Sequence, residues 1–293
     1  MDLRIDQPHI LLRKYISSYS YLDYQGGESE RGSTLRFPSD GGAEIIFNLG
    51  DVLYGGSSLD AVDAYAGARF IGPHSRSFFI KAKGHTQFIS VKLYPGRFRF
   101  FLGFPANEIL NKSMPLSHIW GSQATQLFQK LISSSSFEEM ALWMDRAFLT
   151  LVLNQSLKRQ ELDELVDIIY QSNDQVVVKN LAKHIHLSNR QMERKFQEIV
   201  GFTAKRFCRI RRFNEMLGSL NLYDVNDWAD IANNNRFADQ PHLIRECTYF
   251  TGLSPKKYWS GLPIIHKRLI SLHAKPPILP FSSEDALIAA LQM

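Results

Sequence analysis

Short apolar runs, separated by residues that favour turns, dominate the first hundred positions of the chain. Runs of this kind lie within residues 19–24, 37–50, 68–71, 78–81 and 87–93, and residues 37–50 are expected to form a turn, a buried strand and a second turn. Each run has the length and the flanking Gly, Pro, Asn or Ser residues that are typical of a β-strand. Residues 8–16 are predicted to form a short helix, and residues 26–32 a turn. The first part of the chain is therefore expected to be rich in β-structure.

The spacing of apolar residues changes to a helical period after Pro95. Phe98, Phe101 and Leu102 lie at positions i, i+3 and i+4, which predicts one helix face. Longer apolar stripes of the same period follow at residues 116–120, 127–132 and 137–152. Four consecutive serines at residues 133–136 separate the last two stripes and predict a helical hairpin. This hairpin is expected either to pack on the β-rich part of its own chain or to contact another chain.

Residues 178–259 contain one pattern twice. The first copy runs from Leu181-Ala182 to Gly201, and the second from Ile231-Ala232 to Gly252. Arg194 and Arg245 are 51 positions apart, as are the two glycines. A repeat of this length indicates one supersecondary unit used twice. Ser188 and Asp239 precede the second helix of each unit and are good N-caps, because their oxygens accept from free backbone N–H groups.

These two copies resemble the tandem helix-turn-helix domain of the AraC family of transcription regulators. The first copy matches through Leu181-Ala-x5-Leu187-Ser188-x3-Met192-x-Arg194-x-Phe196-x4-Gly201. The second matches through Ile231-Ala232-x4-Phe237-x-Asp239-x2-His242-Leu243-x-Arg245 and the closing Gly252-Leu-Ser254-Pro255-x2-Tyr258. Three positions depart from the family pattern: Arg236 replaces the usual turn glycine, Cys247 an aromatic residue, and Ala204 stands where the second unit has Pro255.

The first part of the chain is similar to the N-terminal domain of one AraC-type subfamily. Shared phrases are the Pro38-x-Asp40-Gly41 turn before an Ile-Phe-Asn run, the Gly72-Pro73-His74 segment, and Leu93-Tyr-Pro-Gly-x-Phe98. The resemblance implies a β-rich effector domain that binds a small molecule, and it assigns dimerisation to helices in the place of the predicted hairpin. It is also compatible with a homodimer and with contact to RNA polymerase.

Charge supports a nucleic-acid partner for the second part. The whole chain carries a net charge of +5, but residues 178–268 hold 16 Lys/Arg against 8 Asp/Glu. The remainder is therefore mildly acidic. A basic half beside a differently charged half is typical of a DNA-binding domain joined to a domain with another task. A solvated basic surface is the alternative interpretation, which the repeat makes less attractive.

The second helix of each unit is expected to enter the major groove with its N-terminal residues nearest the bases. Base-facing candidates are Asn189, Arg190, Glu193, Arg194, Gln240, His242 and Arg245. Phosphate candidates are Lys179, Lys205, Arg206, Arg209, Lys256 and Lys257. Alternatives stay open: Glu193 could pair along its helix or be solvated, Arg194 could brace two helices, and His242 could brace the turn. Each phosphate candidate could equally be a solvated charge.

The predicted fold class is α+β, with three parts. These are a β-rich effector and dimerisation domain at residues 1–154, a double helix-turn-helix domain at residues 162–262, and a tail at residues 263–293. A final helix is expected at residues 285–291, and the tail could dock on either domain. Residues 154–161 are predicted to be the linker.

The preferred function is a sequence-specific, double-stranded DNA-binding regulator with a small-molecule sensor. The alternatives are a ligand-binding module with weak DNA affinity, and an enzyme with a novel N-terminal site. No catalytic motif, cofactor or metal site is expected, because His74 and His85 lack an assignable partner and the glycine-rich turns lack phosphate-loop spacing. Two cysteines, no signal peptide and no long apolar segment predict a cytoplasmic protein without a membrane partner.

Overall fold

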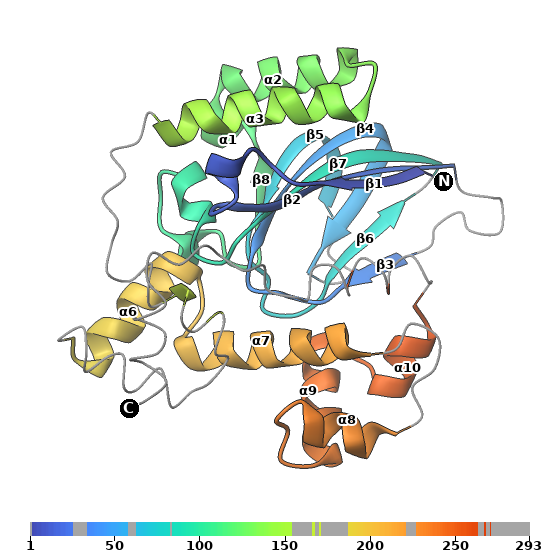
Figure 1. The fold of residues 1–293 in the computed structure, drawn as a ribbon, viewed down its shortest axis with the longest axis vertical. Helices are drawn as coiled ribbons and strands as arrows, with labels where there is room; N and C mark the ends of the chain where they lie inside the picture. Colours follow the sequence, from blue (N-terminus) through green and yellow to red (C-terminus); the bar gives the residue numbers. More distant parts are fainter. Residues whose placement is uncertain are drawn as a thin grey trace.

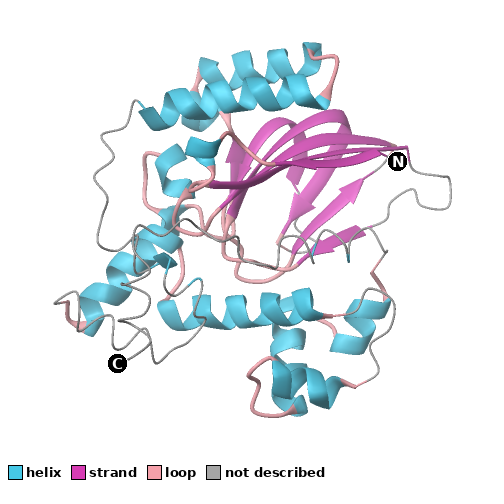
Figure 2. Cartoon of the chain, viewed as in Figure 1, coloured by secondary structure: helices cyan, strands magenta, loops and turns pink. Residues whose placement is uncertain are grey.

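The computed structural model describes most of the chain. The described residues are 2–25, 34–57, 63–82, 84–153, 166–167, 170, 187–220, 227–262, 267 and 270. A curved sheet lies between a layer of helices on one side and the helices of the C-terminal part on the other (Figure 1). The strands gather in one body, with helices on either side of it (Figure 2). The α+β prediction is confirmed.

Within the described residues, eight antiparallel strands form one sheet. Their bounds are β1 (Asp2–Asp6), β2 (Ile16–Gln25), β3 (Thr34–Phe37), β4 (Ala43–Gly56), β5 (Asp63–Ile71), β6 (Phe78–Ala82), β7 (His85–Leu93) and β8 (Ser113–Pro115). The main order is β1-β2-β7-β4-β5-β8, and β6 joins β3 to β4. The long β4 pairs with β5, β6 and β7, so it connects every part of the sheet.

Alternating side chains give the sheet two different faces, as the period of two requires. On β4, Ile45 and Phe47 belong to one buried cluster, while Ile46 between them belongs to another. On β7, Ile89 and Val91 join the first cluster and Phe88 joins the second. The first cluster fills the space under the helices. The second lies on the concave face, which looks toward the C-terminal part.

In the part of the chain that the structure describes, three helices cover the first face (Figure 1). They are α1 (Ser117–Trp120), α2 (Ser122–Ser133) and α3 (Phe137–Leu153). The predicted hairpin of α2 and α3 is confirmed, and buried side chains such as Leu131, Met144 and Phe148 pack against the sheet. The hairpin therefore contributes to the core of its own domain.

Several short elements were missed or misjudged. The helix predicted at residues 8–16 is wrong: a single 3-10 turn, η1 (Ile10–Leu12), is followed at Ile16 by β2. The helix face expected at Phe98 is also only a 3-10 turn, η3 (Phe98–Phe101), and another short turn, η4 (Ala106–Glu108), follows it. Strands β1 and β8 each have one partner strand. As edge strands they need little apolar patterning, which explains why the sequence did not reveal them.

Five helices of the C-terminal part are described. They are α6 (Asn189–Val200), α7 (Ala204–Ser219), α8 (Trp228–Asn234), α9 (Gln240–Thr251) and α10 (Pro255–Ser260). Their apolar faces share one buried cluster. The first helix of the first unit, the linker, most of the helix predicted from Leu162 and the final helix at residues 285–291 lie outside the described residues.

The predicted repeat is visible in how α6 and α9 begin and end. Ser188 caps α6 in a reciprocal capping box with Gln191, and the Asp239 carboxylate caps α9. Both helices end at a left-handed glycine, Gly201 with φ +87° and Gly252 with φ +77°. Because a side chain disfavours that conformation, glycine marks the same stop in both copies.

Arg236 occupies the turn position where the family pattern has glycine, and its backbone keeps the conformation of glycine. Its φ is +61°, and its guanidinium binds the Glu215 carboxylate at 2.5 Å. A left-handed residue with a side chain costs roughly 1–2 kcal/mol. We expect Arg236→Gly to be more stable than Arg236→Ala by about 1 kcal/mol, since both variants lose the ion pair and only glycine relieves the strain.

Urea unfolding of the two Arg236 variants measures this difference. Gln126, exposed in the middle of α2, supplies the control, because there the alanine variant should be more stable than the glycine variant. Equal stability of the two Arg236 variants would show that the turn does not impose the left-handed conformation.

Candidate functional site

The exposed face of α6 carries the base-facing candidates of the first unit. Asn189 and Arg190 are exposed in its first turn, and Arg194 follows one turn later with 71% of its side chain exposed. The only ion pair of Arg194 among the described residues is a 3.8 Å contact with Glu198 on the same helix. The opposite face, with Met192 and Phe196, is buried. Arg194 therefore does not brace two helices here.

The exposed face of α9 repeats this arrangement. Gln240 lies in the first turn, and Arg245 has 69% of its side chain exposed. A long 3.9 Å contact joins Arg245 to the capping residue Asp239. Equivalent arginines of the two units are thus exposed, and each has one weak acidic neighbour on its own element.

Glu193 is engaged inside the domain. Its Oε2 accepts a hydrogen bond from the Ala204 backbone N–H at 3.3 Å, at the first residue of α7. Proline in this place, as at Pro255 in the second unit, would have no N–H to donate. The departure from the family pattern at Ala204 therefore gives Glu193 a positioning contact between α6 and α7.

His242 also has an internal contact. Its Nδ1 accepts from the Ala238 backbone N–H at 3.2 Å, and its ring lies edge-on to Phe237 with centroids 5.5 Å apart. The contact spans the turn between α8 and α9. This geometry corresponds to the bracing role that the sequence left open.

The phosphate candidates fall into two groups. Lys205, Lys256 and Lys257 are exposed. Arg209 forms two hydrogen bonds with the Glu246 carboxylate, at 3.0 and 2.8 Å, and this contact raises the pKa of Arg209. Arg206 donates to the Tyr249 hydroxyl and, at 3.4 Å, to the Ser75 carbonyl. Lys179 lies outside the described residues.

A pocket opens on the concave face of the sheet, between the two parts of the chain. Its volume is about 100 Å³, and apolar side chains form much of its wall. These side chains include Leu22, Ile46, Ile71, Phe78, Ile80 and Phe88. Asn214 of α7 and Ile270 complete the wall from the C-terminal part. An apolar pocket with a few polar groups is the usual form of a small-molecule site.

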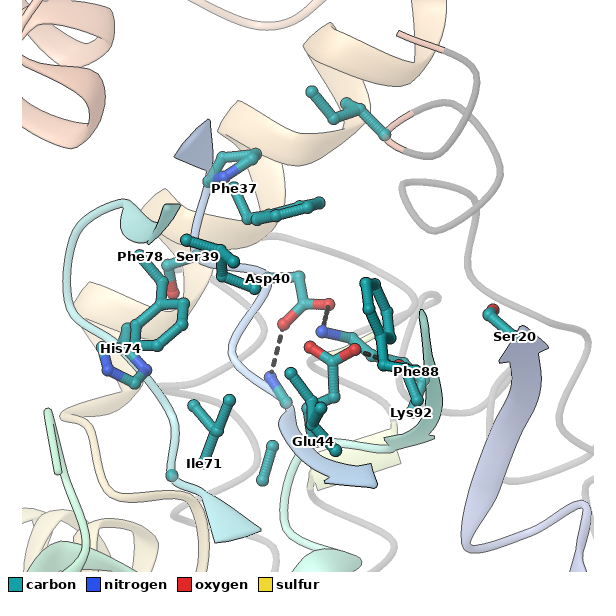
Figure 3. A pocket seen from close by; sticks show the side chains of 18 of the residues that line it. Ser20, Phe37, Ser39, Asp40, Glu44, Ile71, His74, Phe78, Phe88 and Lys92 are labelled. Atoms are coloured by element: carbon teal, nitrogen blue, oxygen red, sulfur yellow. Dashed lines mark hydrogen bonds and ion pairs between the residues drawn. The ribbon is translucent and has the colours of Figure 1, made fainter. Parts of the chain in front are cut away.

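One end of the pocket is charged. The Lys92 ammonium contacts the Asp40 carboxylate at 2.6 Å, and Ser90 donates to Oε1 of Glu44. Figure 3 shows Asp40, Glu44 and Lys92 gathered in the middle of the pocket. Burial alone would lower the pKa of Lys92, but Asp40 and Glu44 raise it above its usual value. Lys92 therefore remains an ammonium.

Strand register explains this cluster, which the sequence analysis did not identify. Glu44 on β4 is directly opposite Lys92 on β7, and Ser20 on β2 is opposite Ser90. Their polar side chains alternate with the apolar residues of the other face. The sequence does show two charged residues, Glu44 and Lys92, inside apolar runs. Only the pairing of β4 with β7 shows that these two residues lie next to each other.

His74 of the Gly-Pro-His segment lines the same pocket and is buried against Phe78, with ring centroids 4.6 Å apart. Burial lowers the pKa of His74 to about 4, whereas a histidine in an unfolded chain has a pKa near 6.5. The unfolded state thus binds a proton that the folded state excludes. The contribution of His74 to stability is complete above pH 6.5 and declines as the pH falls toward 4.

We expect the free energy of unfolding to drop by roughly 2 kcal/mol between pH 7 and pH 5 because of His74. His74→Gln should flatten this pH dependence, and His118→Gln, which changes an exposed histidine on α1, should leave it unchanged. Denaturant unfolding at several pH values measures the slope. An identical slope for wild type and His74→Gln would contradict the assignment.

The pocket wall also holds the end of α9. Ser77, next to the pocket residue Phe78, donates its backbone N–H and its hydroxyl to the Phe250 carbonyl, at 2.9 and 3.0 Å. Arg36, next to Phe37, donates to the Thr251 carbonyl at 2.8 Å. These carbonyls belong to the last turn of α9, where a helix has no partners of its own. The N-terminal part of the chain therefore caps the C-terminal end of α9.

A second junction lies along α7. The Asn214 side chain donates to the Ser39 carbonyl at the rim of the pocket. Gly41 turns with φ +83° directly over Phe207, so closely that a Cβ there would lie 2.6 Å from the ring. The pocket and the reading domain are thus in direct contact.

Other kinds of site find no support in the described ranges. Within them no cluster of His, Cys, Asp and Glu could hold a metal ion. Both cysteines, Cys208 and Cys247, are buried. None of the helices the structure describes has the length and apolar character needed to cross a membrane.

Comparison with known proteins adds the following. Residues 181–260 match the family model described as a helix-turn-helix domain. Residues 5–115 match a model described as "Domain of unknown function (DUF6597)". No curated protein matches the sequence significantly.

Solved structures show distant likeness. The 1.65 Å structure of ToxT from Vibrio cholerae is 11% identical, covering 83% of this chain and 98% of that one with a TM-score of 0.47. Unsaturated fatty acid-bound ToxT from Vibrio cholerae strain SCE256 is 10% identical, covering 83% and 96% with a TM-score of 0.46. The AraC-like activator CuxR is 12% identical, covering 72% and 75% with a TM-score of 0.24.

The helix-turn-helix match spans the region in which the sequence pattern occurs twice. Within it, the described helices α6 and α9 have the same caps, the same glycine stop and an equivalent exposed arginine. Residues 181–260 are therefore a helix-turn-helix domain of the kind found in DNA-binding transcription regulators, placed behind a β-rich N-terminal domain, and the chain resembles the AraC family in this arrangement.

Proposed function

We propose that this regulator recognises a specific double-stranded DNA sequence through α6 and α9, under the control of a small molecule bound in the N-terminal pocket. The observation that carries the DNA-binding part is the equivalent exposure of Arg194 and Arg245 on two capped helices. Arginine binds guanine through two hydrogen bonds, and this is the commonest base-specific contact in the major groove.

The remaining candidates have different roles in this proposal. Asn189, Arg190 and Gln240 accompany the two arginines as base-facing residues, because all are exposed at the N-terminal ends of α6 and α9. Glu193 and His242 position the reading helices through their contacts with Ala204 and Ala238. Lys205, Lys256 and Lys257 contact phosphates.

The position of the pocket supports control by a ligand. Phe37 and Phe78 line it, and their neighbours Arg36 and Ser77 hold the last carbonyls of α9. A molecule that displaces these aromatic side chains would act directly on the second reading helix. A ligand shifts a conformational equilibrium only if it binds one conformation more tightly than the other. Here the two conformations would differ in the positions of the aromatic side chains in the pocket wall.

Selection of bound DNA from a random pool with the purified full chain tests the DNA-binding part. We expect a consensus with two half-sites about one duplex turn apart, roughly 34 Å. The affinity for the selected site should fall steeply with salt, because bound cations release counterions from the phosphates. A pool that shows no enrichment would refute sequence-specific recognition.

A second candidate is a ligand-binding module whose basic part binds DNA weakly or only with a partner. The internal engagement of Arg206 and Arg209 favours it, since both cations are held by Tyr249 and Glu246. A shallow salt dependence and equal affinity for random and selected DNA would support this candidate over the first. Homodimerisation, contact with RNA polymerase and the domain boundaries stay predictions from the sequence.

A further inference from the structure

We infer that the pocket takes a small apolar molecule with a cationic amine head, whose ammonium group binds beside Glu44. This inference rests on the proposed effector role of the pocket and adds the chemical class of the ligand. Three features of the described lining carry it: the sign of the charge, the polar atoms without partners, and the apolar wall.

The charged end of the pocket has an excess of negative charge. Asp40 and Glu44 contribute two carboxylates, and Lys92 contributes one ammonium. His74 adds no charge at neutral pH, because burial keeps its pKa near 4. These are the ionisable groups of the described lining. Lys92 already lies against the Asp40 carboxylate, so its charge is compensated before any ligand arrives.

An anionic ligand would fit this end poorly. A carboxylate brought toward Lys92 would also meet Asp40 and Glu44, and like charges in a partly buried site repel strongly. An ammonium group at the same place is attracted by both carboxylates. The sign of the charge therefore favours a cation over a fatty or aromatic acid.

Several polar atoms in the pocket still need a partner. Among the described contacts, the Glu44 carboxylate is hydrogen-bonded only through Oε1, to Ser90. The hydroxyls of Ser20 and Ser39 are buried and have no hydrogen-bond partner in the structure. Buried polar groups are normally satisfied. Figure 3 shows Ser20 and Ser39 on either side of the charged cluster. An ammonium group has three donors, which suit Glu44 and a hydroxyl oxygen.

The rest of the pocket suits a ring-sized apolar body. Leu22, Ile46 and Phe78 contribute to the wall, and Phe88 lies beside Glu44 and Lys92 (Figure 3). This pocket measures about 100 Å³, less than the roughly 150 Å³ of an apolar cavity that holds benzene, so it limits the apolar body of a ligand to one small ring at most. Aromatic faces also attract an ammonium group directly. The ligand is therefore a compact amine and not a long chain.

Three probes with the same ring and different heads test the inference: benzylamine, benzyl alcohol and benzoate. Isothermal titration calorimetry of each with the full chain at pH 7 compares a cation, a neutral donor and an anion. We expect benzylamine to bind about tenfold more tightly than benzyl alcohol, and benzoate to bind most weakly, since one favourable charge contact is worth about a factor of ten.

Two variants locate the amine site. Glu44→Gln should weaken benzylamine about tenfold and leave benzyl alcohol nearly unchanged, because the charge is removed and the shape is kept. Glu138→Gln, which changes an exposed carboxylate on α3, should alter neither probe. Circular dichroism of both variants verifies that each is folded, and the comparison of the three probes on wild type does not depend on any variant.

The outcomes separate this inference from the proposed function. If benzoate binds as tightly as benzylamine, the amine class is refuted while the effector pocket stands. If none of the probes binds, both the amine class and the ligand control inferred from this pocket are refuted. Selection of bound DNA is an independent measurement, so failure of DNA recognition would appear there and not in the probe titrations.

Discussion

Replacing Arg194 and Arg245 together with alanine is expected to abolish specific DNA binding. Each arginine is exposed at the equivalent position of its helix, and its ion pair is long and solvated. Exposed pairs of this kind contribute about 0–1 kcal/mol, so little holds either side chain away from DNA. A base-reading arginine contributes roughly 1–3 kcal/mol. Because the sites are independent, the double variant should lose roughly 2–6 kcal/mol of binding free energy.

A mobility-shift titration with the selected sequence measures this loss. Each single variant should also accept a wider range of bases at its own half-site in a repeated selection. Arg146→Ala on α3 is the matched control, because it removes an exposed arginine from the N-terminal domain. Unchanged affinity and base preference in the double variant would mean that neither arginine reads DNA.

Glu246 pairs with Arg209, one of the phosphate candidates. Glu246→Ala should destabilise the fold more than replacing any of the exposed DNA-contact candidates. Its buried carboxylate ties α9 to Arg209 of α7 through two hydrogen bonds, at 3.0 and 2.8 Å. Breaking a buried pair costs about 3–5 kcal/mol. Arg209 retains 28% side-chain exposure and can be partly hydrated, so we expect a loss of roughly 2–3 kcal/mol.

Thermal or urea unfolding measures the effect, with Glu246→Gln as the control that keeps the shape and part of the hydrogen bonding. The double variant Arg209→Ala/Glu246→Ala should recover part of the loss, since no unpaired charge is left. The same series decides the role of Arg209. If Arg209→Ala reduces the salt dependence of DNA binding by about one phosphate contact, Arg209 leaves Glu246 to bind DNA; an unchanged slope makes it structural.

Much of the architecture could be predicted because it depends on local patterns. The four Pro- or Gly-bounded runs from residue 37 to residue 93 are strands β4 to β7, and the serine-separated stripes are α2 and α3. Ser188, Asp239, Gly201 and Gly252 have the capping roles that their chemistry predicts. Caps and periodicity act within one or two turns of chain, so they can be interpreted from the sequence alone.

Contacts between distant segments could not be predicted in this way. The pairing of Glu44 with Lys92 depends on the register of β4 against β7. The hydrogen bonds from Ser77 and Arg36 to α9 join residues more than 170 positions apart. Arg209 was considered for phosphate contact because only its charge was visible in the sequence. The structure adds Glu246, which lies on another helix, and this changes what Arg209 is free to do.

The cap on α9 limits how the two domains of this protein can be separated or exchanged with domains of other proteins. The last carbonyls of that helix have their donors in another domain, at Ser77 and Arg36, and Phe207 has Gly41 as its neighbour. A chimaera that fuses this reading domain to an unrelated sensor would leave the helix end without donors and an aromatic ring uncovered. Evolution of new ligand responses in such a chain is therefore constrained to changes inside the pocket, because exchange of the whole sensor would also remove the support of the reading helix.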